Sequence, residues 1–507
     1  MQFGKALPDD SHVAIVSRGI TGSEDGLLCG GLLSDGIIMA IGRHGDLQSM
    51  SISAGHSGLL TDLYELTMAA GYIETRFEAR ATFELFVRHL PTRRGFLVAA
   101  GLEQALDYLE NVSFSTAEIE YLRRHPAFGN ISDRFFDYLA AFRFRGDVWA
   151  MPEGTLVFPD EPILRVTAPI AEAQIVETAL LATINFQTMI ASKAARLVRA
   201  AGRRGVVDFG SRRAHGIESG VLAARAAYIG GCQGTSNVMA GHLFGVPTYG
   251  TQAHSWIMAH ESEEEAFRRF MDFFPEHAVL LVDTYDVRAA VEKIIAAGRK
   301  PQGIRLDSGD LVADSVWARQ CLAEAGWRDV EIFASGDLDE EKIAALLGKG
   351  AQIDAFGVGT SLSTSSDAPA LGVIYKLVEV ETGGTVHEAA KFTEAKVTYP
   401  GRKQVFRLTG ADGKYSGDVI ALEGETVSGG EPLLVPVMRG GRRMAESGTA
   451  EARLREARER CLASVARLPE AVTRLASPGT LPVKHSARLE ALLDEVRRRV
   501  ERAAGIK

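Results

Sequence analysis

The chain has 507 residues, 46% of them hydrophobic and 24% charged, which is the composition of a globular protein rather than a disordered or fibrous one. Its formal net charge of −9 argues weakly against a nucleic-acid role but allows an anionic small substrate. The four cysteines show no metal-binding spacing, no apolar run could span a membrane, and no signal peptide is visible. We therefore expect a cytoplasmic protein that binds neither nucleic acid nor membrane.

The first third of the chain predicts mixed helices and strands. Residues 1–56 are rich in Gly and Ser, contain no recognisable element, and form an extension of unknown role. A helix capped at Thr61 or Asp62 follows, then an alternating strand in ARATFELFVRHLP and a glycine turn into a helix in RRGFLVAAGLEQALDYLENV. Short strands in GDVWAMPEGTLVFPDEPILRVTAP precede one long apolar helix in AEAQIVETALLATINFQTMIASKAARLVRAAG. We assign residues 57–180 to the first part of an accessory domain.

From Gly205 the pattern changes to short apolar runs, each followed by a helical stretch. The runs are VVDFG, VPTYGT, AVLLVDTYD, GIRLDSGD, EIFASGD and AFGVGT. Such a βα repeat predicts parallel strands with right-handed crossovers, which both a barrel and an open doubly wound sheet satisfy. We favour a barrel over residues 181–372 because nearly every run ends in polar residues. A doubly wound sheet would concentrate them at its switch point.

The last part of the chain, residues 373–507, predicts β-hairpins followed by a charged helical tail. The hairpin segments are YKLVEVETGG, TVHEAAKFT and KQVFRLTG. We expect this part to pack with residues 57–180. The predicted fold class is therefore α/β, an irregular TIM-like barrel with an accessory α+β domain built from N- and C-terminal segments.

Polar side chains follow six successive predicted strands, and barrel enzymes carry their chemistry at such ends. Carboxylates suit sugar hydroxyls or a Mg²⁺ that bridges phosphates, and arginines suit a carboxylate or a phosphate. The GVGT turn with its neighbouring hydroxyls suits a phosphate. The set predicts a phosphorylated sugar and an anionic second substrate. In chain order its members are Asp208, Arg212, Arg213, His215, Thr251, His254, Asp283, Asp286, Arg305, Asp307, Asp310, Ser335, Asp337, Gly357, Gly359 and Thr360.

Each member of this set also has a structural explanation. A single histidine at a strand end, such as His254, is more often structural than an acid, base or nucleophile. Arg212 and Arg213 could be a solvated pair, and Asp283 could cap the next helix. The structural explanation would have to hold at six separate strand ends, which favours a shared site. No GxxxxGK[ST], GxGxxG or HExxH motif is present, so nucleotide chemistry would have to use the barrel mouth.

Eight long segments lie in order between about 59 and 380. They are TDLYELTMAAGY, FELFVRHLPTRRGFLVAAGLEQAL, VDFGSRRAHG, GGCQGTSNVMAGHLFGVPTYGTQAHSW, LLVDTYD, GIRLDSGDL, FASGDLDE and DAFGVGTSL. Through these segments the chain resembles the nicotinate phosphoribosyltransferases. The resemblance implies that nicotinate and 5-phosphoribosyl 1-diphosphate form nicotinate mononucleotide and pyrophosphate, the first step of NAD salvage from nicotinate. It also implies ATP hydrolysis through a phosphohistidine, Mg²⁺, and a homodimer with shared active sites.

The resemblance also implies roles for individual residues. His254, in GTQAHS, maps to the catalytic, phosphorylated histidine, and Tyr64, in TDLY, maps to the residue that stacks on the pyridine ring from the neighbouring subunit. The other nicotinate contacts are expected at Arg212, Thr251 and Arg305. Asp283 and Asp307 map to catalytic ribose contacts and to Mg²⁺ ligands. Phosphoribosyl diphosphate is expected to contact Ser335, Gly336, Gly357, Gly359 and Thr360.

Other functions stay open from the sequence. A nicotinamide phosphoribosyltransferase would leave the arginines without the carboxylate that they suit. A quinolinate phosphoribosyltransferase is disfavoured by the ATP-linked GTQAHS segment. A non-catalytic phosphosugar-binding barrel or a scaffold would be expected to carry broken motifs, and none is found. An isomerase that uses the same barrel mouth is allowed because a fold does not fix a function.

Overall fold

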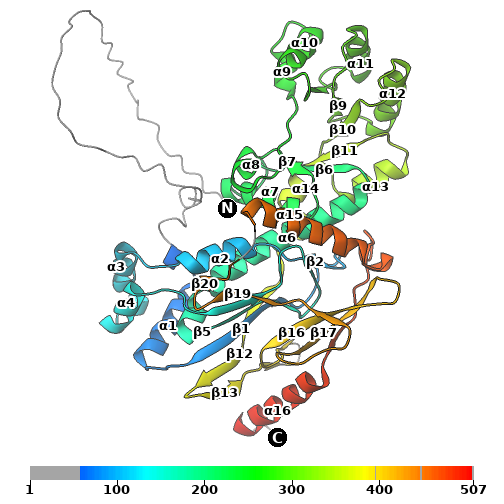
Figure 1. Cartoon of the computed structure of the whole chain (residues 1–507). Helices are drawn as coiled ribbons and strands as arrows, with labels where there is room; N and C mark the ends of the chain where they lie inside the picture. Colours follow the sequence, from blue (N-terminus) through cyan, green and yellow to red (C-terminus); the bar gives the residue numbers. More distant parts are fainter. Residues whose placement is uncertain (1–56, 394–395, 446–447, 505–507) are drawn as a thin grey trace, which may run out of the picture. The chain divides into compact units, whose positions relative to one another are not determined.

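The computed structural model describes residues 57–393, 396–445 and 448–504, which all belong to one compact unit (Figure 1). The segment 1–56, expected from the sequence to be an extension, lies outside the described residues. No helix in the described ranges combines the length and the apolar character needed to cross a membrane.

Strands from both ends of the chain form one antiparallel sheet. β1, from the first third, pairs with β5 on one side and with β12, from the last third, on the other. This shared sheet confirms that the accessory part is built from N- and C-terminal segments. Its strand order is β13 (Thr385–Glu388), β12 (Val373–Thr382), β1 (Arg80–Val87), β5 (Pro162–Pro169), β3 (Asp147–Ala150), β19 (Val435–Arg439) and β20 (Arg442–Arg443).

The βα repeat forms a six-stranded parallel sheet, which confirms the mixed α/β class. Its order is β7 (Gly234–Thr235), β6 (Gly205–Asp208), β11 (Ala355–Val358), β10 (Glu331–Ala334), β9 (Gly303–Leu306) and β8 (Val279–Leu281). Among the described residues, no ladder pairing joins β8 back to β7, so the barrel is irregular. The helices of this part are α7 (Ile217–Ile229), α8 (Val238–Phe244), α9 (His254–Met258), α10 (Glu263–Phe273), α11 (Val287–Ala296), α12 (Leu311–Glu324), α13 (Glu340–Gly348) and α14 (Thr360–Ser363).

Helix α6 (Glu177–Ala201) connects the two sheets, because it contacts β12 of the antiparallel sheet and β6 of the parallel sheet (Figure 1). Residues 187–197 of this helix are all buried, so this part of it is enclosed on every side. The enclosed part includes Lys193 and Arg196, whose charges must therefore find partners inside the protein.

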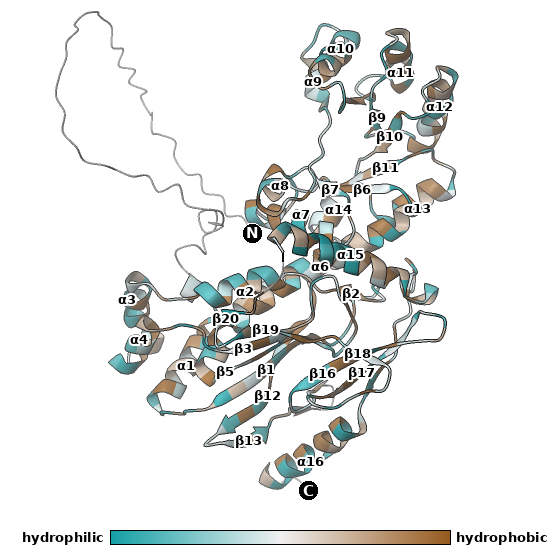
Figure 2. Cartoon of the chain, viewed as in Figure 1, coloured by the Kyte–Doolittle hydropathy of each residue, from teal (hydrophilic) through white to brown (hydrophobic). Residues whose placement is uncertain are grey.

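The remaining elements surround these sheets. Figure 2 shows hydrophobic residues along β1, β3 and β5, where Leu85, Val148 and Val166 are fully buried. The other helices are α1 (Leu63–Glu74), α2 (Leu102–Asn111), α3 (Thr116–Arg124), α4 (Asp133–Ala140), α5 (Ile170–Ile175), α15 (Ala450–Ala466) and α16 (Ala487–Ala504). The other strands are β2 (Leu97–Val98), β4 (Leu156–Val157), β14 (Phe392–Thr393), β15 (Lys396–Val397), β16 (Lys403–Thr409), β17 (Tyr415–Leu422), β18 (Gly430–Pro432) and β21 (Val483–His485).

Two local expectations were wrong. The run VPTYGT contains only an isolated bridge between Thr248 and Thr235, because Pro247 has no N–H to donate to a ladder. The long helix expected over residues 171–202 is interrupted at Val176, which separates α5 from α6. The two hairpins formed by β12 with β13 and by β16 with β17 are as expected.

Candidate functional site at the strand ends

Arg305, on β9, is the centre of a hydrogen-bonded group at the ends of the parallel strands. Its Nε donates to Ser335 Oγ at 2.8 Å, and its Nη2 donates to Asp307 Oδ1 at 2.6 Å. Its Nη1 donates to Thr251 Oγ1 at 2.8 Å and to the Gln252 carbonyl at 3.3 Å. Four of the five guanidinium N–H groups are thereby used within the protein. The structure brings together four residues that the sequence predicted at three separate strand ends, namely Thr251, Arg305, Asp307 and Ser335.

Asp307 links this group to the next carboxylate. It also accepts a hydrogen bond from Ser335, and its main-chain N–H donates to Asp283 Oδ2 at 3.0 Å. Burial opposes ionisation, but the Ser335 hydroxyl and the Arg305 charge outweigh it and hold the pKa of Asp307 below its ordinary value. Asp307 is therefore an anion at neutral pH.

His254 lies beside this anion as the first residue of α9. Its Nδ1 is 3.2 Å from Thr284 Oγ1, and its Nε2 is 3.8 Å from Asp307 Oδ2. The side chain is 43% exposed. An imidazole that is fixed through Nδ1 and accessible at Nε2 can accept a group from a bound substrate at that nitrogen. His254 therefore lies beside the strand-end carboxylate of Asp307.

The carboxylates of Asp283 and Asp307 suit a shared metal but do not form a complete metal site. Asp283 Oδ2 accepts from Ser308 Oγ at 2.6 Å, whereas its buried Oδ1 has no partner among the described residues. Within those residues, no group of three or more His, Cys, Asp or Glu side chains could hold a metal. Mg²⁺ commonly uses one or two carboxylates together with water and substrate phosphates. The donor set therefore fits a Mg²⁺ that is bound together with a phosphorylated substrate.

Two of the three glycines predicted to contact phosphoribosyl diphosphate, Gly336 and Gly357, lie where a side chain would not fit. Gly336 has φ +97°, and a Cβ there would lie 2.0 Å from the Asp307 carbonyl oxygen. Gly357 is buried, and a Cβ there would lie 2.7 Å from Phe209 and 2.8 Å from Phe333. These two positions let the β10 turn and the end of β11 lie close to their neighbours. Thr360 follows as the exposed first residue of α14.

Arg212 is not hydrogen-bonded to the Arg305 group in the part of the chain that the structure describes. It is exposed on the loop after β6, and among the described residues no hydrogen bond joins it to another predicted site residue. The loop is anchored by Asp208, which accepts from the Gly210 N–H at 2.8 Å and from Thr235 Oγ1 at 2.7 Å. Burial raises the pKa of Asp208 to about 6 despite these bonds.

Tyr64 is also outside the strand-end group. It lies on α1, which packs against α4 and α5 of the accessory part, and it is 46% exposed. Burial of its hydroxyl and the charges of Glu177 and Glu65 raise the pKa of Tyr64 above its ordinary value. The Tyr64 side chain is therefore uncharged. The described contacts of one chain do not bring it to Arg305.

Several residues of the site were missed from the sequence. The Thr284 hydroxyl binds the His254 ring, the main-chain carbonyl of Gln252 accepts from Arg305, and Ser308 donates to Asp283. The Arg305 guanidinium also lies 5.5 Å from the centre of the Phe209 ring. Each of these residues, Phe209 after Asp208 included, is directly next to a predicted residue, so the loop sequences already carried a signal for them.

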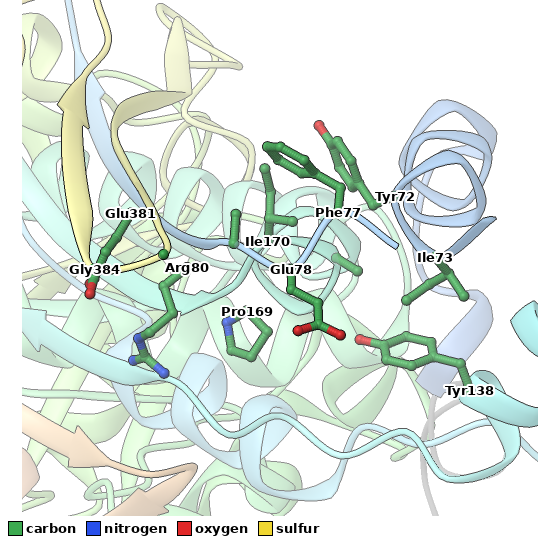
Figure 3. Close-up of a pocket in the computed structure, with 13 residues that line it drawn as sticks. Tyr72, Ile73, Phe77, Glu78, Arg80, Tyr138, Pro169, Ile170, Glu381 and Gly384 are labelled. Atoms are coloured by element: carbon green, nitrogen blue, oxygen red, sulfur yellow. The ribbon is translucent and has the colours of Figure 1, made fainter. Parts of the chain in front are cut away.

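A pocket of about 410 Å³ lies in the accessory part, away from the strand ends. Figure 3 shows the Tyr72 and Phe77 rings on one side and the Glu78 carboxylate directed toward the Tyr138 hydroxyl. None of the predicted site residues lines it. The charged residues that line this pocket include both acidic and basic side chains, so the lining favours no particular class of substrate.

Three family models match successive parts of the chain. Residues 59–185 match the nicotinate phosphoribosyltransferase N-terminal domain, residues 205–407 match the nicotinate phosphoribosyltransferase family, and residues 426–493 match its C-terminal domain. Nicotinate phosphoribosyltransferase pncB2 of Mycobacterium tuberculosis (strain ATCC 25618 / H37Rv) is 44% identical over 455 residues, which cover 88% of this chain and 96% of that protein.

A second relative and a solved structure give the same result. Nicotinate phosphoribosyltransferase of Bacillus subtilis is 44% identical over 381 residues, which cover 73% of this chain and 77% of the relative. The crystal structure of human nicotinic acid phosphoribosyltransferase is 30% identical, with a TM-score of 0.74, and covers 87% of this chain and 100% of that chain. The matches span the accessory part, the parallel sheet and the C-terminal part, and the chain belongs to the nicotinate phosphoribosyltransferase family.

Proposed function

We propose that this protein converts nicotinate and 5-phosphoribosyl 1-diphosphate to nicotinate mononucleotide and pyrophosphate, with ATP hydrolysed to ADP and phosphate. The observation that carries the proposal is the position of His254 Nε2, 3.8 Å from a carboxylate that is itself bonded to Arg305. Family membership supports the same substrates. The reaction would be the first step of NAD salvage from nicotinate.

The transfer needs positioning and charge stabilisation more than acid or base catalysis. Displacement of pyrophosphate from the anomeric carbon passes through an oxocarbenium-like state, which fixed carboxylates such as Asp283 and Asp307 stabilise. Mg²⁺ held by these two carboxylates would neutralise the negative charge of the leaving pyrophosphate. The Thr360 hydroxyl and the glycine turns would bind the phosphate groups of the sugar. The Ser335 hydroxyl, expected to do the same, is buried and donates its one proton to Asp307.

The arginines favour nicotinate over its neutral amide. Arg305 has one N–H group left for a ligand, so it can orient the substrate but cannot hold a carboxylate through two bonds of its own. Arg212 is exposed and can supply the main charge for the nicotinate carboxylate. Nicotinamide carries no charge and would gain little from either residue.

His254 would accept the γ-phosphoryl group of ATP at Nε2, with ADP as the leaving group, and water would later release phosphate. The bond to Thr284 occupies Nδ1 and leaves Nε2 accessible. A phosphoryl group on Nε2 would place negative charge beside the carboxylates and change the binding of metal and diphosphate. ATP hydrolysis could in this way be linked to substrate binding.

Pyrophosphate release in the presence of phosphoribosyl diphosphate tests the reaction. We expect release with nicotinate, and little with nicotinamide or quinolinate at equal concentrations. Release with quinolinate or nicotinamide instead of nicotinate would replace the proposed substrate. Absence of release with all three pyridines would contradict the proposed activity and favour a phosphosugar-binding role.

Labelling with ATP carrying γ-³²P tests the phosphohistidine. We expect an acid-labile, base-stable phosphoprotein that is absent in His254→Ala. His260→Ala is a matched control, because His260 lies six residues later and its Nδ1 is only 2.7 Å from the Trp256 carbonyl. Labelling that survives His254→Ala, or that is lost in the control alone, would refute the assignment.

We also propose a homodimer in which Tyr64 of one chain completes the site of the other. Leu63, Tyr64 and Met68 present a large apolar surface on α1, each at least 40% exposed. A second exposed apolar set lies at the strand ends, on the loops and short helices after β6, β7 and β8, and consists of Ile217, Val238, Met258 and Tyr285. If the α1 set of one chain packs against the strand-end set of the other chain, both exposed apolar surfaces are removed from water.

Subunit mixing tests the shared site. Tyr64→Ala and His254→Ala homodimers are each expected to be weakly active or inactive. If Tyr64 acts across the interface, mixed dimers regain one intact site, so activity returns on mixing. Mixtures that exchange subunits and stay inactive would place Tyr64 and His254 in the same chain's site.

A cytoplasmic location belongs to the same proposal. Cys232, Cys321 and Cys461 are free thiols, and Cys29 lies outside the described residues. Free thiols are usual in a reducing compartment. Recovery of the activity in the cytosolic fraction of its source cells would test the location.

A further inference from the structure

Five charged side chains, four of them buried and the fifth partly exposed, connect the two loops that are expected to bind phosphoribosyl diphosphate. The set consists of Arg94, Lys193, Arg196, Glu340 and Asp367. Lys193, on the enclosed part of α6, is only 2% exposed. Its Nζ donates to Glu340 and lies 2.8 Å from Asp367 Oδ1.

The two carboxylates in this set belong to different loops. Glu340 is the first residue of α13 and directly follows the β10 turn that contains Ser335 and Gly336. Asp367 lies in the segment after β11 that begins with Gly359 and Thr360. Lys193 therefore joins both loops to the same buried helix.

Arg94 and Arg196 complete the connections. Arg94, from the loop between β1 and β2, donates to Ser365 Oγ at 2.8 Å and to Asp367 Oδ1 at 3.1 Å. Arg196 Nε donates to Glu340 Oε1 at 2.9 Å. Each carboxylate is thus held by Lys193 and by one arginine.

Both loops contain backbone that needs such support. Ser365 has φ +44° and Asp337 has φ +47°, a region that residues with a side chain rarely occupy. Such conformations persist only where the surroundings determine them strongly. The Arg94 bond to Ser365 acts directly on one of these residues.

The cluster is ionised and depends on each of its cations. Burial opposes the charge of Glu340 and Asp367, but Lys193 and the arginines outweigh burial and hold the pKa of both carboxyls below the ordinary value. Removal of one cation would leave an anion that is poorly compensated inside the protein. The loop that carries this anion would then move toward water or toward another partner.

We propose that Lys193 is a positioning residue for phosphoribosyl diphosphate, because it fixes the β10 and β11 loops relative to each other through Glu340 and Asp367. It does not touch the substrate. This inference rests on the proposed function, since it concerns the phosphosugar side of that site. The nicotinate side, built around Arg305 and Arg212, shares with these loops the Arg305 bond to Ser335, while Arg305 is also held by Thr251, Gln252 and Asp307.

Lys193→Met tests the inference, because it removes the charge and keeps a long apolar side chain. We expect KM for phosphoribosyl diphosphate to rise roughly 10- to 100-fold, since small misplacements of binding groups have effects of this size. KM for nicotinate should change less than about threefold, because Arg305 keeps its bonds to Thr251, Gln252 and Asp307 when the β10 loop moves. Lys193→Arg keeps the charge and should recover most of the lost affinity.

Lys403→Met is the matched control. Lys403 is also buried and pairs with Glu84 at 2.8 Å, but it joins β16 to β1 in the accessory part. Lys403→Met should lower the stability of the protein without changing KM for phosphoribosyl diphosphate or for nicotinate. An equal rise of both KM values in Lys193→Met, or the same selective rise in Lys403→Met, would overturn the inference. Should Lys193→Met fail to fold, Asp367→Asn is expected to show the same selective rise in milder form, and an unchanged KM there would also overturn it.

Calorimetric titration with phosphoribosyl diphosphate alone separates this inference from the proposed reaction. A wild-type protein that binds phosphoribosyl diphosphate but leaves nicotinate unchanged contradicts the proposed reaction only. Weaker binding in Lys193→Met than in Lys403→Met then supports the positioning role, and equal binding refutes it. A wild-type protein that does not bind phosphoribosyl diphosphate contradicts both proposals.

Discussion

The carboxylate of Asp307 lies between Arg305, which donates to its Oδ1 at 2.6 Å, and His254, whose Nε2 is 3.8 Å from its Oδ2. One side chain thus connects the guanidinium of the expected nicotinate site with the imidazole expected to carry phosphate. A change at Asp307 should affect both.

Asp307→Asn is expected to lower kcat/KM by roughly 10²- to 10³-fold, because it removes a fixed negative charge from the reacting centre. Steady-state kinetics with nicotinate and phosphoribosyl diphosphate measure this. Asp286→Asn is the control, since Asp286 only caps α11 through the Ala289 N–H at 2.8 Å. Comparable losses in both variants would mean that the effect is not specific to Asp307.

Thr284→Val should slow phosphorylation of His254 roughly 5- to 10-fold, the effect of losing one hydrogen bond of about 1 kcal/mol. The variant keeps the shape of the side chain but cannot bind Nδ1. Initial rates of labelling from ATP provide the measurement, and Thr284→Ser should retain most of the rate. An unchanged rate in Thr284→Val would show that the ring needs no such anchor.

Gly336→Ala should reduce activity by about 100-fold, because the turn must shift at the substrate. The new Cβ would lie 2.0 Å from the Asp307 carbonyl oxygen, and φ is +97°. We also expect a loss of about 1–3 kcal/mol in the free energy of unfolding from the strained backbone. Gly348→Ala is the control, since no atom lies within 4 Å of its added Cβ. Full activity in Gly336→Ala would contradict the tight packing of this turn.

Glu161→Gln should flatten the dependence of stability on pH. Burial and the negative charge of Asp418 raise the pKa of Glu161 well above its ordinary value. The folded protein therefore keeps a proton that the unfolded chain releases. The contribution of Glu161 to the free energy of unfolding is full below the ordinary carboxyl pKa, and it declines as pH rises toward the folded-state pKa.

Glutamine mimics the protonated form at every pH, so the variant should melt about 1–3 °C higher than the wild type at pH 9 and no higher at pH 5. Thermal unfolding at the two pH values is the measurement. Glu431→Gln, at an exposed position on β18, should change neither melting temperature. A Glu161→Gln variant that is less stable at pH 9 would mean that the carboxylate is charged and paired in the folded state.

Much of the site was predictable because it is local in the sequence. Parallel strands bring their carboxyl ends to one edge, so the polar residues after β8, β9 and β10 had to lie near each other. Asp283, Arg305 and Ser335 follow this rule. The geometry of VPTYGT did not follow it, because the missing N–H of Pro247 limits the run to an isolated bridge.

The charged cluster around Lys193 could not be predicted in the same way. Its carboxylates, Glu340 and Asp367, are 147 and 174 residues away in the chain, and no spacing rule connects such positions. The sequence of α6 indicated an apolar helix but not that it would be enclosed on every side. Only the tertiary packing shows where a lysine in that helix finds its partners.

The four protein bonds of Arg305 have a consequence for binding energetics. Its long side chain loses its rotational freedom when the protein folds, so this loss of entropy is not repeated when a substrate arrives. A ligand that meets Arg305 therefore encounters a rigid donor of fixed direction. Substitutions that release the guanidinium should weaken binding through added disorder even where its charge stays in place.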